Sequence, residues 1–166
     1  MNATYLNRFA QIALAGMLFL ASVPNAPAQQ QISPGSDDLK GTWIATVTQR
    51  DCQSGQPLGS PFQSLLTFAE GGTLTESAAN PAFFPDERGP GHGVWSSRGG
   101  NLYSASSIAF ITDNGALAMT QVITQTIVMS NDPDKYSAIK AVVQFFDPTG
   151  KLLRSGCATA VAQRFN

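Results

Sequence analysis

The amino-acid sequence predicts an all-β protein, folded as a single eight-stranded antiparallel up-and-down β-barrel. Two observations support this prediction. Short runs rich in Thr, Val, Ile, Phe and Ser, which suit the half-buried surface of a sheet, alternate with turn signals, and helical periodicity is almost absent. The first and last runs also carry one cysteine each, Cys52 and Cys157. A first strand that pairs with the last closes a sheet into a barrel, which we prefer to a sandwich.

Eight strands follow from this pattern. In chain order they are expected at residues 42–50, 61–69, 73–78, 92–98, 101–111, 116–129, 136–146 and 152–165. The turns between them use Gly, Asn, Asp and Pro, as in Asp113-Asn114-Gly115. Gly and Asn supply the positive φ that tight hairpins need, and Pro presets the entry to a turn. Hairpins that join an even number of strands leave the first and last strands antiparallel, as closure requires.

The N-terminal residues predict export. Residues 1–28 combine Arg8, the apolar run 12–23 and the small-x-small site Ala26-Pro27-Ala28, which is the layout of a cleaved signal peptide. An uncleaved anchor is the weaker alternative, because a spanning helix needs about 20 apolar residues. We therefore expect a secreted or periplasmic protein with no integral membrane segment after processing. Residues 29–38 are expected to form a flexible leader, and residues 39–166 the barrel domain.

The two cysteines predict one disulfide across the seam of the barrel. Two cysteines in an exported chain most simply pair with each other, and no CxxC spacing or metal-ligand cluster supports a free reactive thiol. If Cys52 and Cys157 lie directly opposite each other on antiparallel strands, Trp43 faces Asn166 and Ala45 faces Arg164.

Composition argues against several classes of function. The chain has 10 basic and 11 acidic residues, a net charge of −1 and no basic cluster, so the electrostatic footprint of nucleic-acid binding is missing. No nucleophile elbow, P-loop or dinucleotide fingerprint occurs, and we predict neither a cofactor nor a metal. The aspartates Asp132, Asp134 and Asp147 belong to turns, and calcium would need more oxygen ligands than their spacing provides.

Both ends of the barrel domain resemble the lipocalin (calycin) family. Those barrels begin with Gly-x-Trp, here Gly41-Thr42-Trp43, and place an arginine, here Arg164, over that tryptophan at the closed end. The chain departs from the family pattern, because Thr112-Asp113-Asn114 falls one hairpin too early for the usual Thr-Asp-Tyr-like turn and the C-terminal helix is missing. The allene oxide cyclase-like barrels fit the missing helix better, although no motif points to them.

The resemblance implies an interior ligand site, and the small residues near the seam favour a cavity there. The Trp43 face of the terminal strands carries the small side chains Ala45, Val47, Ala158, Ala160 and Ala162. An eight-stranded barrel is just wide enough either to be filled by side chains or to hold one small ligand. The opposite orientation would bury Ile44, Val161 and Phe165 instead, and the sequence leaves that alternative open.

The leading functional hypothesis is binding of a small, mostly apolar molecule inside the barrel. The expected ligand-binding residues are Trp43, Phe83, Phe84, Arg88, His92, Trp95, Tyr103 and Phe110. Phe83 and Phe84 lie in the one long connection, residues 79–91, and would act either as a lid or as a packed plug. Arg88 or His92 would provide a polar anchor.

Two alternatives from other classes stay open. The first is a cofactor-free cyclase or isomerase, in which Glu76, His92 and Tyr103 would converge on one cavity. For His92 we prefer the simpler interpretation, a histidine in a turn or at the start of a strand whose flanking glycines serve the backbone shape. The second is a structural or interaction protein of the envelope, and a homo-oligomer is compatible with a strand at 120–129 that has no fully polar face.

Overall fold

The computed structural model describes residues 37–84 and 86–166, so the predicted signal peptide and most of the leader lie outside the described residues. Two short 3-10 helices, η1 and η2, span Asp37–Leu39 and Pro81–Phe83. The strands are β1 Gly41–Arg50, β2 Phe62–Phe68, β3 Thr73–Ala78, β4 Glu87–Arg88, β5 Gly91–Gly99, β6 Leu102–Asp113, β7 Ala116–Met129, β8 Lys135–Phe146 and β9 Leu152–Arg164. The eight predicted strands are therefore present, with ends that differ by at most two residues.

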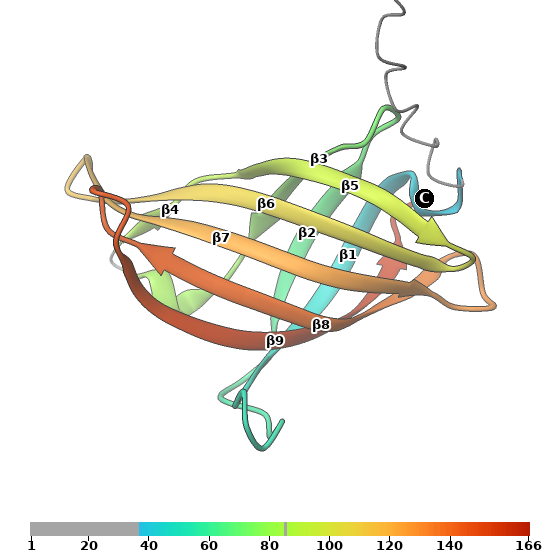
Figure 1. Cartoon of the computed structure of the whole chain (residues 1–166), viewed down its shortest axis with the longest axis horizontal. Helices are drawn as coiled ribbons and strands as arrows, with labels where there is room; N and C mark the ends of the chain where they lie inside the picture. The colour runs from blue at the N-terminus through green and yellow to red at the C-terminus, as the bar shows by residue number, and fades with distance from the viewer. Residues whose placement is uncertain (1–36, 85) are drawn as a thin grey trace, which may run out of the picture. The chain divides into compact units, whose positions relative to one another are not determined.

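These strands form a closed antiparallel barrel, as the sequence predicts. Each long strand pairs with the next one along the chain, and β9 returns to pair with β1 (Figure 1). The two-residue strand β4 is an addition that the sequence pattern did not predict. It pairs with β6 at Glu87–Thr112, whereas β5 begins its pairing with the same strand at His92–Ile108. Pro90, which has no N–H to donate, lies between the two.

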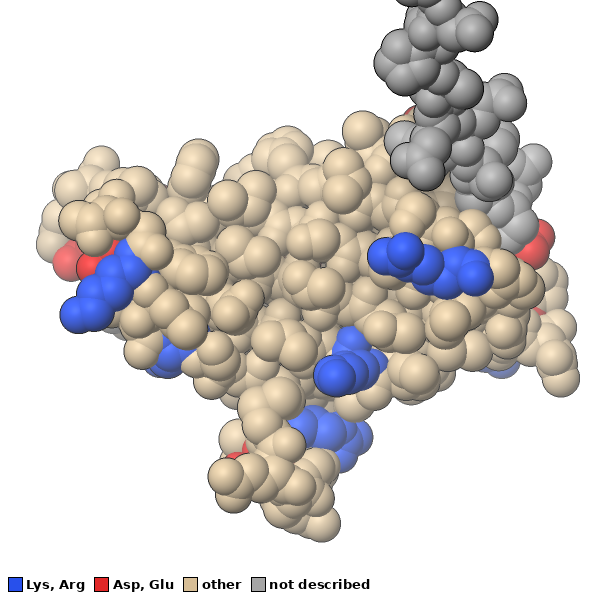
Figure 2. Space-filling view, in the orientation of Figure 1, with Lys and Arg blue, Asp and Glu red and all other residues tan. Residues whose placement is uncertain are grey.

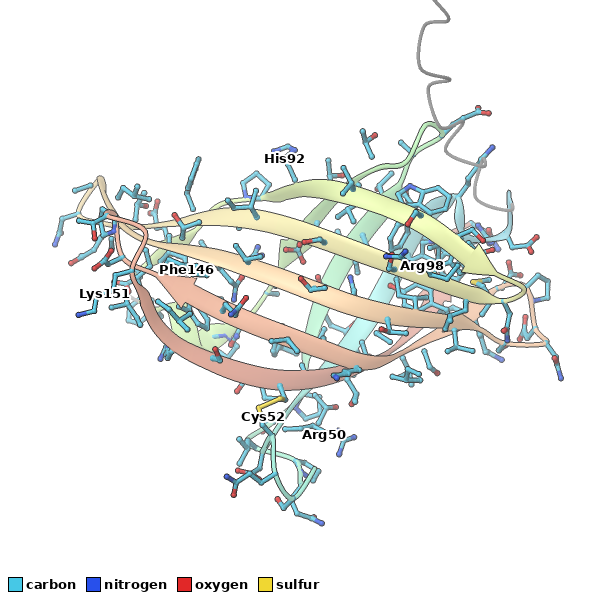
Figure 3. The ribbon with its side chains drawn as sticks, viewed as in Figure 1. Arg50, Cys52, His92, Arg98, Phe146 and Lys151 are labelled. Carbon is cyan, nitrogen blue, oxygen red and sulfur yellow. A yellow bond between two sulfur atoms is a disulfide. The ribbon has the colours of Figure 1, made fainter. Side chains whose placement is uncertain are left out.

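The disulfide is confirmed, but the predicted register of the seam is wrong by two residues. Trp43 pairs with Arg164, and Arg50 pairs with Cys157. Cys52 lies beyond the end of β1, in a turn where the Asp51 carboxylate accepts a hydrogen bond from the backbone N–H of Ser54. The bond to Cys157, with a Cα–Cα distance of 5.2 Å, therefore joins this turn to β9 rather than two facing strand residues (Figure 3).

One end of the barrel is closed by Trp43 and its neighbours. The Trp43 indole N–H donates to the Leu39 carbonyl at 3.0 Å, and the Arg164 guanidinium lies 4.2 Å from the centroid of the Trp43 ring. Arg164 also donates to the Asp134 carboxylate and to the Lys40 carbonyl. Gly41 has φ +118°, and a Cβ there would come within 2.8 Å of Arg164. The expected contact between Trp43 and Arg164 is present, and the glycine makes room for it.

The Trp43 face of the seam points inward. Ile44, Val161 and Phe165, which the opposite orientation would bury, are exposed on the outer surface. Ala45 and Ala158 are buried instead. Because the inward side chains near the seam are so small, the interior beyond the aromatic end is not filled by them.

Candidate functional site

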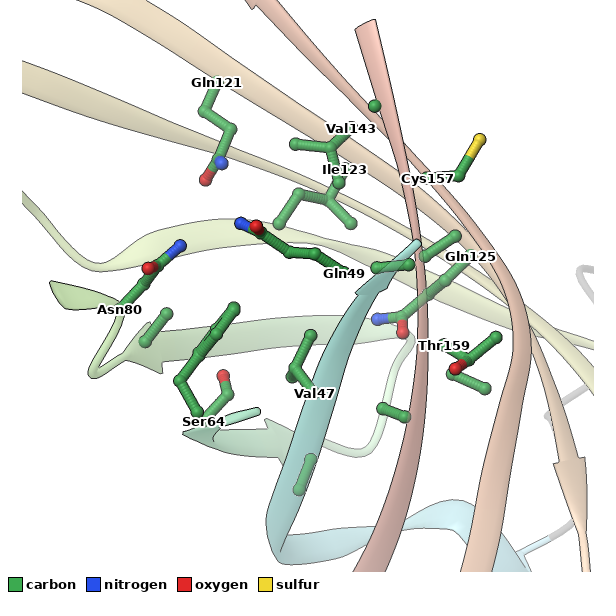
Figure 4. A pocket seen from close by; sticks show the side chains of 18 of the residues that line it. Val47, Gln49, Ser64, Asn80, Gln121, Ile123, Gln125, Val143, Cys157 and Thr159 are labelled. Carbon is green, nitrogen blue, oxygen red and sulfur yellow. The ribbon is translucent and has the colours of Figure 1, made fainter. Parts of the chain in front are cut away.

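The barrel encloses a cavity of about 440 Å³ beyond the aromatic closed end. Its walls come mainly from β1, β8 and β9, with further side chains from β2, β3 and β7, and many of the side chains are small and aliphatic (Figure 4). They include Ala45, Val47, Ile123, Ala138, Ala141, Val143, Ala158 and Ala160. The alanines and the valine that the sequence places on the inward face of the seam, except Ala162, therefore line open space.

The long connection between β3 and β5 contributes Phe83 to the cavity wall. The Asn80 side chain caps η2 by accepting a hydrogen bond from the Ala82 N–H at 3.0 Å, which fixes the turn that carries Phe83. The Phe83 ring lies 6.4 Å from the Phe145 ring, and the Arg154 guanidinium lies 4.3 Å from the centre of that second ring. Phe83, Phe145 and Arg154 all line the cavity.

A buried ion pair forms part of the cavity wall. Arg88 donates to the Glu76 carboxylate at 2.5 Å, and the two side chains are only 2% and 6% exposed. Ser107 donates to the same carboxylate oxygen at 3.0 Å, and the Arg88 Nε–H donates to the Gln121 side-chain oxygen. Removing one member of a buried pair leaves a charge in a low dielectric, so such pairs depend on this kind of complete support. The Glu76–Arg88 pair is electrically neutral as a unit.

Tyr136 reaches the same cavity from β8. Its ring packs edge-on against Trp43 at 4.9 Å, and the residue is 2% exposed. Burial raises the pKa of Tyr136, and the negative charge of Glu76 raises it further, so the hydroxyl is protonated at neutral pH. Among the described residues, none forms a hydrogen bond with this hydroxyl, although every fully occluded side-chain nitrogen and oxygen there has a partner. The hydroxyl therefore reaches open space, and the space that Tyr136 lines is the cavity.

The structure brings only two of the eight expected ligand-binding residues to this cavity, Phe83 and Arg88. Trp43, Trp95 and Tyr103 belong to the aromatic core at the closed end. Phe84 is 89% exposed and lies outside the cavity lining.

His92 and Phe110 lie on the outer surface of the barrel (Figure 3 for His92). The reason is the two-residue period of a strand: Gly91 and Ile111, one position away from each, take the inward places. His92 therefore cannot anchor an interior ligand. The grouping of Glu76, His92 and Tyr103 that the cyclase or isomerase alternative needs is also not formed, because Glu76 alone of the three lines the cavity.

Sequence reasoning missed Gln121 and Tyr136 as cavity residues. The available signal was the mixed face of β7, where Gln121 and Gln125 share one side with Ile123 and Ile127. An amide among aliphatic residues on an inward face marks a lining that is wet or ligand-facing, since a filled core would leave the amide without partners.

Charge is sparse on the surface as well. On the face that Figure 2 shows, basic side chains lie in separate groups over a mostly uncharged surface. In the described part of the chain, no three of the His, Cys, Asp and Glu side chains gather as a metal site would require. Nor do residues 37–84 and 86–166 contain a helix long and apolar enough to cross a membrane.

Comparison of the chain with protein-family models, curated proteins and solved structures finds no match.

Proposed function

We propose that this barrel binds a small, largely apolar molecule in its interior cavity. The observation that carries the proposal is the cavity itself, whose volume of about 440 Å³ falls in the range of small-molecule sites. Aliphatic walls and a few polar groups at fixed positions are also typical of such sites. The seam residues Ala45, Ala158 and Ala160 keep this volume open, where larger aliphatic side chains would fill it and add stability.

The position and contacts of Phe83 support a role for this side chain as a lid on the cavity. Phe83 is carried by a capped turn in the long connection between β3 and β5, and its ring lies beside Phe145, which also lines the cavity. A hinged movement of this connection would open the mouth without breaking a strand of the barrel. Phe84 does not share this role, since it is exposed and lies outside the cavity lining.

Export and kinship with the lipocalins are further parts of the proposal. The Cys52–Cys157 disulfide supports a secreted or periplasmic location, because disulfides persist in oxidising compartments. The Gly41–Trp43–Arg164 contact at the closed end supports a lipocalin-like ancestry. It is the same contact on which the resemblance rests.

Filling the cavity tests the binding function. Ala158→Leu should place a larger side chain in the cavity, because Ala158 is buried on its wall. We expect the affinity for N-phenylnaphthylamine, a neutral probe whose fluorescence rises in apolar surroundings, to fall about ten-fold or more. Fluorescence titration of the purified protein measures it.

Val161→Leu is the matched control, because Val161 lies on the same strand but is 62% exposed on the outer face. It should bind the probe as the unsubstituted protein does. Absence of probe binding to the unsubstituted protein, or equal binding by both variants, would count against an interior site.

A further inference from the structure

Three polar groups on the cavity wall have hydrogen-bonding capacity that the described residues do not use. They are the Tyr136 hydroxyl, the amide nitrogen of Gln121 and the second carboxylate oxygen of Glu76. The three residues are 2%, 5% and 7% exposed. Buried polar groups are nearly always satisfied, so groups that turn toward a cavity without a protein partner indicate a ligand or water that satisfies them.

These groups face one another across the barrel. Glu76 lies on β3 and Tyr136 on β8, and in the closed ring of eight strands these two are separated by three strands on either side. Gln121 is held beside Glu76 because Arg88 donates to both. The effect of the Glu76 charge on the Tyr136 hydroxyl is consistent with both facing the same cavity.

We propose that the deep end of the ligand carries a neutral hydroxyl group, held between Glu76 and Tyr136; this inference rests on the proposed interior binding. The ligand O–H donates to the free oxygen of Glu76. The ligand oxygen accepts from the Tyr136 hydroxyl and from the Gln121 amide. A hydroxyl is the smallest group that offers both a donor and an acceptor, and it therefore matches all three wall groups.

A carboxylate does not match this end of the cavity. Arg88, the cation of the cluster, is already paired with Glu76, so a second carboxylate would meet a like charge in a low-dielectric interior. A hydrocarbon end would leave all three groups without partners. The expected ligand class is thus a small apolar alcohol or phenol.

Three probes with the same ring system distinguish a hydrocarbon, a hydroxyl and a carboxylate at this end of the ligand. They are naphthalene, naphthol and naphthoate. Their affinities are measured by displacement of N-phenylnaphthylamine from the purified protein. We expect naphthol to bind about five-fold more tightly than naphthalene, because one net hydrogen bond is of that size. Naphthoate should bind most weakly.

Tyr136→Phe removes the hydroxyl and keeps the ring against Trp43. It should abolish most of the preference for naphthol over naphthalene. Tyr103→Phe is the matched control, since Tyr103 is equally buried but lies outside the cavity lining. That control should keep the preference.

The outcomes distinguish the two proposals. Naphthalene binding without a naphthol preference, a preference for naphthoate, or an unchanged preference in Tyr136→Phe would overturn the hydroxyl site and leave interior binding intact. Failure of every probe to bind would overturn both. The affinities of the unsubstituted protein alone decide the class of ligand, so the test stands even if Tyr136→Phe does not fold.

Discussion

At the scale of single residues, Gly91 shows how the sequence accommodates a buried charge. Gly91 is directly opposite Glu76 in the pairing of β3 with β5, and a Cβ at Gly91 would overlap the Glu76 side chain. Glu76 cannot move aside, because Arg88 and Ser107 hold its carboxylate. The glycine is therefore required by space rather than by backbone conformation.

Gly91→Ala should accordingly lower the free energy of unfolding by about 1–3 kcal/mol, the usual cost of overpacking. Gly156→Ala is the matched control, since Gly156 lies in β9 and a Cβ there would meet nothing within 4 Å. The control should be neutral or slightly stabilising, because alanine restricts the unfolded chain. Urea unfolding measures both variants, and an equal effect of the two would contradict the steric explanation.

At the scale of secondary-structure elements, the Glu76–Arg88 pair attaches the long connection to the barrel. Arg88 is half of the two-residue strand β4, and the neighbouring Gly89 N–H donates to the Phe110 carbonyl at 2.9 Å. A strand this short has few backbone hydrogen bonds of its own. We therefore expect the buried ion pair to be the main contact that keeps residues 79–90 in place against the barrel.

Arg88→Met should release this connection and cost about 3–5 kcal/mol of stability, because it leaves Glu76 buried without its cation. Hydrogen exchange at Gly89 and its neighbours should become faster. Arg98→Met, at an exposed arginine of β5, is the control and should leave exchange unchanged. Adding Glu76→Leu to Arg88→Met should restore part of the stability, since the uncompensated charge is then gone. No recovery in the double variant would contradict the assignment.

At the scale of the whole barrel, the seam between β1 and β9 is held in two ways. Eight residue pairs from Trp43–Arg164 to Arg50–Cys157 form the ladder, and the Cys52–Cys157 disulfide closes a loop with a sequence separation of 105. The ladder and the aromatic packing at the closed end stabilise the folded state. The disulfide acts largely by restricting the unfolded chain.

Replacing both cysteines by alanine should therefore lower the free energy of unfolding by about 2–5 kcal/mol. The dependence on urea should become steeper, because the unfolded chain without the cross-link exposes more surface. Affinity for N-phenylnaphthylamine should change little, since the ladder still defines the cavity. An unchanged free energy of unfolding would contradict the predicted stabilisation, and loss of probe binding in a folded variant would show that the disulfide also shapes the native barrel.

The sequence alone determined the eight strands of the barrel, their order and the closure of the sheet. Alternation and turn chemistry are local properties, and residues such as Asn114 and Gly115 fix a hairpin wherever it lies in the molecule. Closure followed from an even number of hairpin-linked strands with a cysteine near each end. Even the contact of Trp43 with Arg164 was predicted, although the two residues pair directly at one end of the seam rather than diagonally.

Only the tertiary structure decided the register of the seam and the composition of the cavity wall. The strand period tells which side chains face inward but not how deep along the barrel each one lies, since depth depends on how far neighbouring strands are offset. Trp95 and Tyr103 face inward yet belong to the closed end, whereas Tyr136 extends into the cavity. Glu76, Arg88 and Gln121 come from three different strands, and their meeting depends on closure of the whole sheet. Non-local contacts of this kind have no signature in any one stretch of sequence.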